Sequence, residues 1–400
     1  MDKVWMKALN PKLYLIGLAA GFILCTGLGH LIAGQRLPIP DFARFYYYVN
    51  PDGGFYPTFK QLLAQAQATE GQDRQATLVI VGGDSVFFGE GQSAKDIWTK
   101  YLEAELNKVP GKKYRVVNLA MPGMKAFEAG FWVFEHLHRN RPKGKVLFVT
   151  NALPINFIEP IGTRPAAYLY HQARVGGFIP ALKEREDYVQ KHADLTVADA
   201  SDQETFFLQA WINHFFADEE LWTRFTYSVM GSYYHRSTDY KSLLPRRLFK
   251  DPEVNRSAFA GIGCEHLEIG VQGIIRWIDA LDYPVLKHKR QERLIFFDRL
   301  KYASLASVSE ELRGDTLVFV SSISPFYLSQ MGERYRSEYV KVKRDWVSVL
   351  KQCGFRASAL NETLKEDDYV DYDHLTVSGG KAMACAVAAE ILKGASSAGR

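Results

Sequence analysis

Two polar motifs that are far apart in the chain contain residue types suited to nucleophilic chemistry. Ser85 stands in Gly83-Asp84-Ser85, directly after an apolar run, and Asp371 and His374 stand three residues apart near the C-terminus. A serine hydroxyl is a weak nucleophile unless a base takes its proton. A carboxylate beside an imidazole fixes the tautomer and stabilises the imidazolium that then forms. Ser85, His374 and Asp371 are therefore a candidate triad.

Each motif also has a plain structural interpretation. Glycine, aspartate and serine are common turn residues, so a Gly-Asp-Ser tripeptide alone is weak evidence for a catalytic serine. An aspartate ahead of the last helix also fits an N-cap. Taken alone, Asp371 and His374 fit capping and catalysis equally well, and Asp373 is a second candidate partner for His374.

Two further segments carry candidate donors for an oxyanion. The segment 118–123, Asn-Leu-Ala-Met-Pro-Gly, follows one expected strand, and Thr150-Asn151 ends another. Acyl transfer passes through an oxyanion, which needs two or three donors aimed at one point. We expect the backbone N–H groups of Ser85 and Gly123 and the side-chain amide of Asn151 to supply them. Individually, Gly123 also fits a turn and Asn151 a cap.

Strand and helix patterns alternate around these motifs. Short apolar runs predict buried strands, and longer stretches with apolar residues on one side predict helices. The alternation predicts an α/β fold, a three-layer α/β/α sandwich with a parallel sheet. Ligands of such sheets bind beyond the carboxyl ends of the strands, where the candidate residues fall. Strands are expected at 77–81, 114–118, 145–150 and 316–321, and helices at 93–109, 127–138, 345–353 and 381–392.

The alternation is lost in the middle of the chain. A domain over residues 76–400 is therefore expected to carry a largely helical insertion at about 155–290, with helices at 206–216, 219–230 and 270–281. Insertions of this kind often shape a substrate site. A cap over the site and a purely structural helical layer both fit this segment.

The N-terminal segment predicts a membrane anchor over residues 1–34, followed by a juxtamembrane segment over 35–75. Residues 13–34 contain no charge and are long enough to cross a hydrocarbon core of about 30 Å. Lys3, Lys7 and Lys12 precede the apolar run, so the N-terminus is expected in the cytoplasm and the rest outside. A cleaved signal peptide is the alternative, but the end of the run lacks a clear small-x-small cleavage site.

Composition excludes several other classes. The 400 residues are 47% hydrophobic and 24% charged, as in ordinary globular proteins, and the formal net charge of +4 gives no reason to expect a nucleic-acid partner. The four cysteines show no zinc-like spacing, so neither a metal nor another cofactor is expected.

Taken together, the motifs resemble the four blocks of the SGNH (GDSL) hydrolase family. The blocks here read Gly83-Asp-Ser-Val-Phe-Phe-Gly89, Asn118-Leu-Ala-Met-Pro-Gly123, Val149-Thr-Asn151 and Asp371-Tyr-Asp-His374. The resemblance covers about residues 76–155 and 314–393. It implies that Ser85 is the nucleophile, His374 the base and Asp371 its orienting carboxylate. It also implies that Ser85, Gly123 and Asn151 form the oxyanion hole.

An anchor joined to such a domain resembles bacterial cell-envelope acyl-transfer proteins, such as alginate O-acetylation proteins and the D-alanine transfer protein of teichoic acid. The resemblance implies O-acylation of an envelope polysaccharide at the periplasmic face of the inner membrane, beside a membrane-embedded acyltransferase of the MBOAT class. A membrane-tethered esterase or lipase is the first alternative. A non-catalytic polysaccharide-binding or assembly protein on the same fold is the second. The substrate-binding residues are not identifiable from the sequence.

Overall fold

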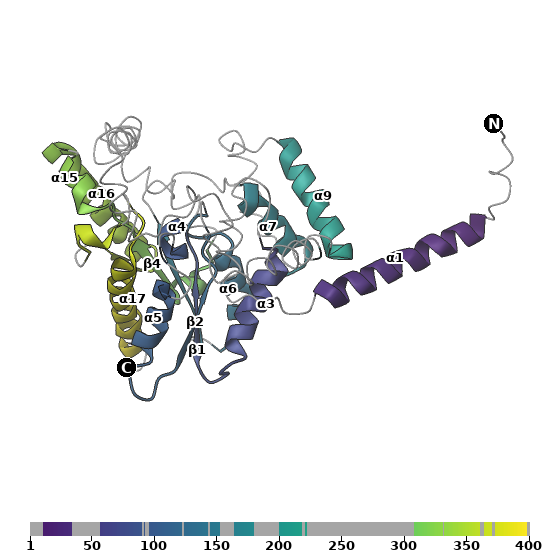
Figure 1. The fold of residues 1–400 in the computed structure, drawn as a ribbon, viewed down its shortest axis with the longest axis horizontal. Coiled ribbons are helices and arrows are strands. Elements are labelled where there is room, and N and C mark those ends of the chain that lie inside the picture. Colours follow the sequence, from purple (N-terminus) through teal and green to yellow (C-terminus); the bar gives the residue numbers. More distant parts are fainter. Residues whose placement is uncertain are drawn as a thin grey trace, which may run out of the picture.

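The structure is a computed structural model of the 400-residue chain, shown as a ribbon in Figure 1. It describes residues 11–33, 57–89, 92, 96–121, 124–142, 145–152, 164–179, 200–217, 221, 308–330, 332–360, 364–369 and 373–397.

A sheet of five parallel strands forms the centre of the fold, as the alternating pattern predicts. Its order is β2-β1-β3-β4-β5, so the chain changes direction across the sheet between β1 and β3. Every neighbouring pair is parallel. Ligands of open α/β sheets bind at such a switch point, beyond the carboxyl ends of the strands. The strands are β1 (Thr77–Val81), β2 (Tyr114–Asn118), β3 (Val146–Ala152), β4 (Thr316–Val320) and β5 (Arg356–Ala359).

Buried apolar clusters cover both faces of the sheet. In β1, Leu78 and Ile80 point into one cluster, whereas Val79 and Val81 point into the other. This is the two-sided burial that makes a parallel strand read as a continuous apolar run. The first cluster includes residues of α3 (Phe59–Glu70), α6 (Gly130–Arg139) and α16 (Gly332–Gln352), and the second includes residues of α4 (Ser85–Phe88), α5 (Trp98–Leu106) and α17 (Val377–Ser397).

Helix α3 lies in the segment expected to be juxtamembrane, yet it is part of the folded core. A capping box begins it: the Thr58 side chain accepts the Gln61 N–H at 3.3 Å, and the Gln61 side chain accepts the Thr58 N–H at 2.8 Å. Phe59 and Leu62 are fully buried against the sheet. The core therefore extends N-terminally of residue 76.

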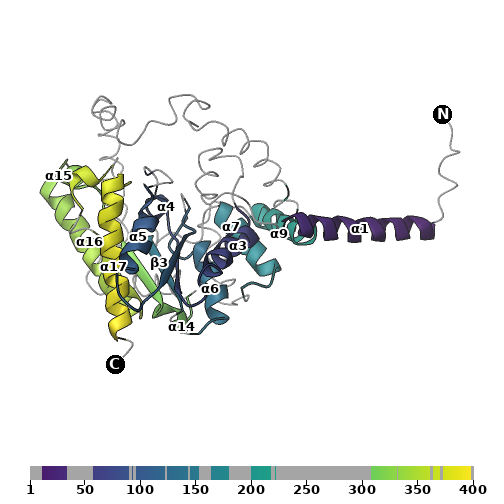
Figure 2. The ribbon, with the colours of Figure 1, turned by 60° about the horizontal axis from the view of Figure 1, so that its bottom comes forward.

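Helix α1 (Pro11–Ala33) projects away from this core, and Figures 1 and 2 show it extending from one end of the domain. Residues 11–32 are long and apolar enough to cross a membrane, and α1 is the one helix with this property in the described part of the chain. Two helices of the expected insertion lie at the same end, α7 (Arg164–Val175) and α9 (Ala200–Phe216). The helices expected at 219–230 and 270–281 fall outside the described residues, Leu221 excepted.

Candidate active site

Ser85 lies at the first position of α4, immediately beyond the carboxyl end of β1. The turn between them needs Gly83, which has a φ of +109°. A β-carbon at Gly83 would also overlap the side-chain oxygen of Asn151. Gly89 ends the helix in the left-handed conformation. Gly83 therefore permits a sharp strand-to-helix turn that leaves Ser85 half-buried at the sheet edge, and Gly89 ends α4 after a single turn.

The structure brings Ser85 and His374 together across 289 residues of sequence. The His374 Nε2 atom lies 2.8 Å from the Ser85 Oγ atom. The His374 side chain is 14% exposed, so the contact is sheltered but reachable. Because a base must lie within hydrogen-bond reach of the proton it removes, this geometry is suited to general-base activation of the serine.

A carboxylate stands on the other side of the imidazole. The Asp373 Oδ1 atom lies 3.2 Å from His374 Nδ1, and Asp373 is buried. A negative charge there favours the tautomer with a proton on Nδ1, which leaves Nε2 free to accept the proton of Ser85. Asp371, the carboxylate that the motif favours, lies outside the described residues. The pairing of Asp371 with His374 therefore stays a prediction.

The turn that carries His374 is fixed from both sides. Tyr369 and Leu375 form an antiparallel bridge, and the Thr376 N–H donates to the Asp368 carbonyl at 2.9 Å. Gln92, which the motifs do not single out, accepts the Trp98 N–H at 2.8 Å and donates to the Leu375 carbonyl at 3.5 Å. Gln92 thus links the segment after α4 to the segment that carries His374.

Asn151 is fully buried at the end of β3, and its side chain forms hydrogen bonds with Asp84, the residue before Ser85. Its Nδ2 donates to Asp84 Oδ1 at 2.7 Å and to Ser321 Oγ at 2.8 Å. Its Oδ1 accepts the Asp84 N–H at 3.2 Å. Both amide hydrogens are therefore engaged, and a contribution to an oxyanion would require one of these bonds to be exchanged.

Asp84 is the N-cap of α4 and is itself buried. Its Oδ1 accepts the Val86 N–H at 2.9 Å in addition to the bond from Asn151. Burial raises the pKa of the Asp84 carboxyl, although the hydrogen bonds from Asn151 and Val86 oppose this shift. The sequence identifies Asp84 only as a motif residue. In the structure, its hydrogen bonds connect the turn after β1 to Asn151.

The segment after β2 runs beside the serine turn. Asn118 donates from Nδ2 to the carbonyls of Phe87 and Phe88 at 3.1 and 3.3 Å. The Met121 N–H donates to the Gly83 carbonyl at 3.1 Å. Asn118 and Met121 thus tie this segment to α4 and to its turn. Gly123 itself lies outside the described residues.

A buried polar layer continues behind Asn151 and was not anticipated from the sequence. The Tyr339 hydroxyl accepts the Ile323 N–H at 3.1 Å and donates to the Ser321 carbonyl at 3.4 Å. Lys343 Nζ donates to Ser322 Oγ at 3.4 Å. Burial raises the pKa of Tyr339, so it remains a neutral phenol. No sequence spacing links α16 to these serines, because the contacts arise only from the fold.

No protein-family model matches this chain, and no curated protein matches it in sequence.

Proposed function

We propose that this chain is a serine acyl-transfer enzyme with the three-layer fold and the catalytic groups of the SGNH type. The observation that carries the proposal is the 2.8 Å contact between Ser85 Oγ and His374 Nε2. The position of Ser85 after β1 and of Asn151 at the end of β3 supports it, because both flank the switch point of the sheet.

In the first half-reaction, His374 Nε2 removes the proton of Ser85 as Oγ attacks the carbonyl carbon of an acyl ester. The Ser85 N–H, which has no partner within its helix as the first helical residue, is one donor to the oxyanion. The N–H of Gly123 is the second. His374 then returns the proton to the departing alcohol, and the acyl group remains on Ser85.

In the second half-reaction, an acceptor hydroxyl gives its proton to His374 and attacks the acyl-serine. Collapse of the oxyanion releases the new ester, and the proton returns to Ser85. Asp371 holds the His374 ring and stabilises its cation in both halves. Asp373, 3.2 Å from Nδ1, adds negative charge on the same side. This chemistry needs no metal or other cofactor.

The favoured acceptor is a hydroxyl of an envelope polysaccharide. Helix α1 supports this choice, because a tether raises the effective concentration of polymers that emerge at a membrane. Lys3, Lys7 and Lys12 precede α1 and favour a cytoplasmic N-terminus, with the domain at the periplasmic face of a bacterial inner membrane. A membrane-embedded MBOAT-type acyltransferase is the proposed acyl donor.

The first test is turnover of a small activated ester by the purified full chain in detergent. Ser85→Ala should abolish turnover while circular dichroism shows an unchanged fold. Ser329→Ala is the matched control, because Ser329 is an exposed serine on α15 (Pro325–Gln330). Near wild-type turnover by Ser85→Ala would refute the proposal.

A second test separates transfer from hydrolysis. The enzyme is loaded with an acetyl ester, envelope oligosaccharides are added, and the products are followed by mass spectrometry. A bound hydroxyl should outcompete water through effective molarity. Acetylated oligosaccharide that disappears with Ser85→Ala supports transfer. Acetate release that no acceptor alters would instead favour the tethered esterase.

A further inference from the structure

Helix α9 carries a stripe of large apolar side chains that are exposed in the described part of the chain. Their spacing of one, three, one and three residues places them on one side of the helix. On the opposite side, Ala210 and Asn213 are buried. The α9 stripe consists of Phe207, Leu208, Trp211, Ile212 and Phe215, which are 38–60% exposed.

The C-terminal end of α9 contacts α1. The ring of Phe22 lies 5.6 Å from that of Phe215 and 5.1 Å from that of Phe216, measured between centroids. His30 Nε2 donates to the His214 carbonyl at 2.8 Å. Gly29 is buried in this seam, and a β-carbon there would overlap the Phe216 carbonyl.

This contact fixes the depth of α9 along the apolar helix. The contacts run from Phe22 to His30, which lie eleven and three residues before the end of α1 at Ala33, or roughly 16 Å and 5 Å at 1.5 Å per residue. If α1 spans a bilayer, the Phe215 end of α9 therefore lies at a level where α1 itself is surrounded by lipid. In Figures 1 and 2, α9 lies beside the end of α1 that is nearer the domain.

We infer that α9 is a membrane-interface helix, with the α9 stripe in contact with phospholipid acyl chains of the outer leaflet. This rests on the proposal that α1 spans the membrane. Lipid is the favoured occupant because the stripe continues the exposed apolar surface of α1 across the Phe22 contact. Tryptophan and phenylalanine on one side of such a helix are typical of interfacial helices.

Cationic side chains stand where lipid headgroups would lie. Lys60 Nζ is 3.4 Å from His30 Nδ1, near the outer end of α1, and the Arg174 guanidinium lies 5.9 Å from the Phe207 ring centre. Cations near an anionic leaflet strengthen interfacial binding.

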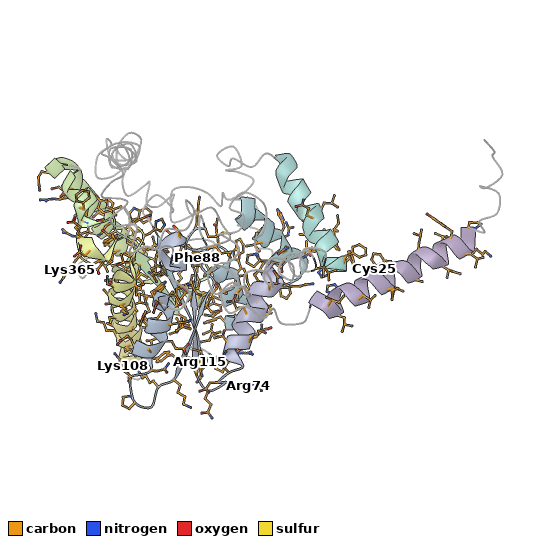
Figure 3. All side chains as sticks on the ribbon, viewed as in Figure 1. Cys25, Arg74, Phe88, Lys108, Arg115 and Lys365 are labelled. Atoms are coloured by element: carbon orange, nitrogen blue, oxygen red, sulfur yellow. The ribbon has the colours of Figure 1, made fainter. Side chains whose placement is uncertain are left out.

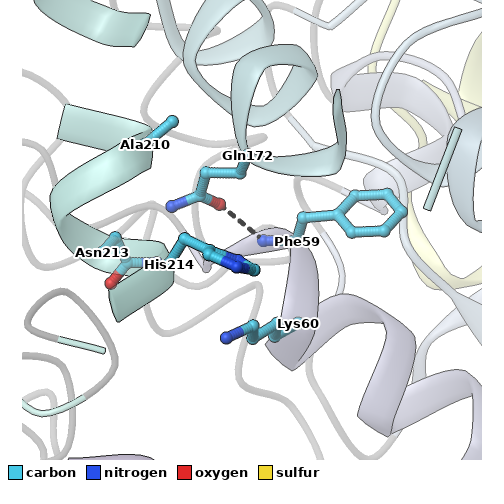
Figure 4. Close-up of a pocket in the computed structure, with 6 residues that line it drawn as sticks. All are labelled: Phe59, Lys60, Gln172, Ala210, Asn213 and His214. Atoms are coloured by element: carbon cyan, nitrogen blue, oxygen red, sulfur yellow. Dashed lines mark hydrogen bonds between the residues drawn. The ribbon is translucent and has the colours of Figure 1, made fainter. Parts of the chain in front are cut away.

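The buried side of α9 is joined to the catalytic domain. Figure 4 shows a crevice between α3, α7 and α9, where the Phe59 N–H donates to Gln172 Oε1 at 2.8 Å. Ala210, Asn213 and His214 of α9 line the same crevice. Since α3 packs on the sheet, an interfacial α9 would hold Ser85 at a fixed height above the membrane.

The test is lipid quenching of a fluorophore at single cysteines in the full chain. Cys25, Cys264, Cys353 and Cys385 are replaced, and one label is then placed at Leu208→Cys, at Gln209→Cys or back at native Cys25. A fourth site is Lys365→Cys, which Figure 3 shows at the end of the domain opposite α1. The proteins are reconstituted in phosphatidylethanolamine–phosphatidylglycerol vesicles that contain nitroxide lipid.

Strong quenching is expected at Cys25 and at Leu208→Cys, with several-fold weaker quenching at Gln209→Cys and little at Lys365→Cys. Quenching at Leu208→Cys no stronger than at Lys365→Cys, with Cys25 quenched, would overturn the inference and leave the anchor intact. Shielding of Leu208→Cys from both nitroxide lipid and aqueous iodide would overturn the inference and assign the stripe to protein contact within or between copies of this chain. An unquenched Cys25 would overturn the anchor and this inference together. None of these outcomes depends on ester turnover.

Discussion

The serine site and the α1–α9 seam are built from different kinds of contact. Around Ser85, buried hydrogen bonds of 2.7–3.2 Å connect Asp84, Asn151 and Ser321, and a 2.8 Å contact joins Ser85 to His374. At the seam, aromatic rings and one glycine make most of the contact. Directional bonds fix reacting atoms, whereas apolar contacts fix a level relative to lipid. Substitutions around Ser85 should therefore alter the rate of turnover, whereas substitutions at the α1–α9 seam should alter the position of α9 relative to the membrane.

The largest effect is expected from His374→Ala. Loss of the base should reduce kcat on an activated ester by about 10⁴- to 10⁶-fold. The double variant Ser85→Ala/His374→Ala should be little worse than either single variant, because the two act as a unit. His136→Gln is a control, since His136 on α6 contacts the Phe178 carbonyl. Defects that multiply in the double variant would show independent action.

The next largest effect on kcat is expected at the two carboxylates that could orient His374, namely Asp371 and Asp373. If Asp371 is the orienting carboxylate, as we propose, Asp371→Asn should reduce kcat by about 10³- to 10⁴-fold, because the imidazole then loses the partner that fixes its tautomer. Asp373→Asn should have a smaller effect, since Asp373 supplies nearby charge. Steady-state kinetics of both variants decides between them. The reverse order of losses would transfer the orienting role to Asp373.

A smaller effect on kcat is expected from substitutions of Asn151 and of its hydrogen-bond partner Ser321. If Asn151 donates to the oxyanion after releasing Ser321, Asn151→Ala should cost about 10²-fold in kcat with little change in KM. Ser321→Ala removes only the resting partner and should cost less than about tenfold. Equal losses in kcat would contradict donation by Asn151 to the oxyanion, because Ser321→Ala leaves the Asn151 amide and its bonds to Asp84 in place.

Asp84 should also make stability depend on pH. Burial raises the pKa of Asp84 in the folded chain. At pH values just above the ordinary pKa of a carboxyl group, the folded state therefore binds more protons than the unfolded state. Stability should therefore fall as pH rises from the unfolded pKa through the folded one. Thermal melting of Asp84→Asn against pH should lack this decline. Parallel curves for wild type and Asp84→Asn would contradict the assignment.

The smallest effect on turnover is expected at the seam. Gly29→Val should force α1 away from Phe216, because its β-carbon would overlap that carbonyl. Turnover of a soluble ester should stay within about twofold of wild type, because Gly29 contacts none of the residues around Ser85 and distant sites usually couple weakly. Quenching at Leu208→Cys should fall. A large loss of turnover would show that α1 supports the site directly.

The sequence predicts the sheet wherever apolar, β-branched residues dominate a run, as in β1 and β4. It does not reveal β5, because Arg356–Ala359 holds arginine, alanine and serine at the sheet edge, where one-sided burial leaves no apolar run. Helix α3 was also missed, although Thr58 and Gln61 form a recognisable capping box.

The residues of the candidate site also differ in how far the sequence predicts their contacts. The approach of Ser85 to His374 follows from their places at a strand end and before the last helix, so spacing and element order predict it. The partners of Asn151 do not follow from any spacing, because Asp84 lies after β1 and Ser321 lies after β4. The sequence does not identify Gln92 or Tyr339 either, because only the folded chain brings them to the site.

The most direct test is to find which serine oxygen an active-site phosphonylating probe modifies. The full chain is treated with a fluorophosphonate probe, digested and analysed by mass spectrometry, beside His374→Ala. We expect a single adduct on the peptide that contains Ser85, formed far more slowly in His374→Ala. An adduct at another serine, or equal labelling without His374, would contradict this expectation.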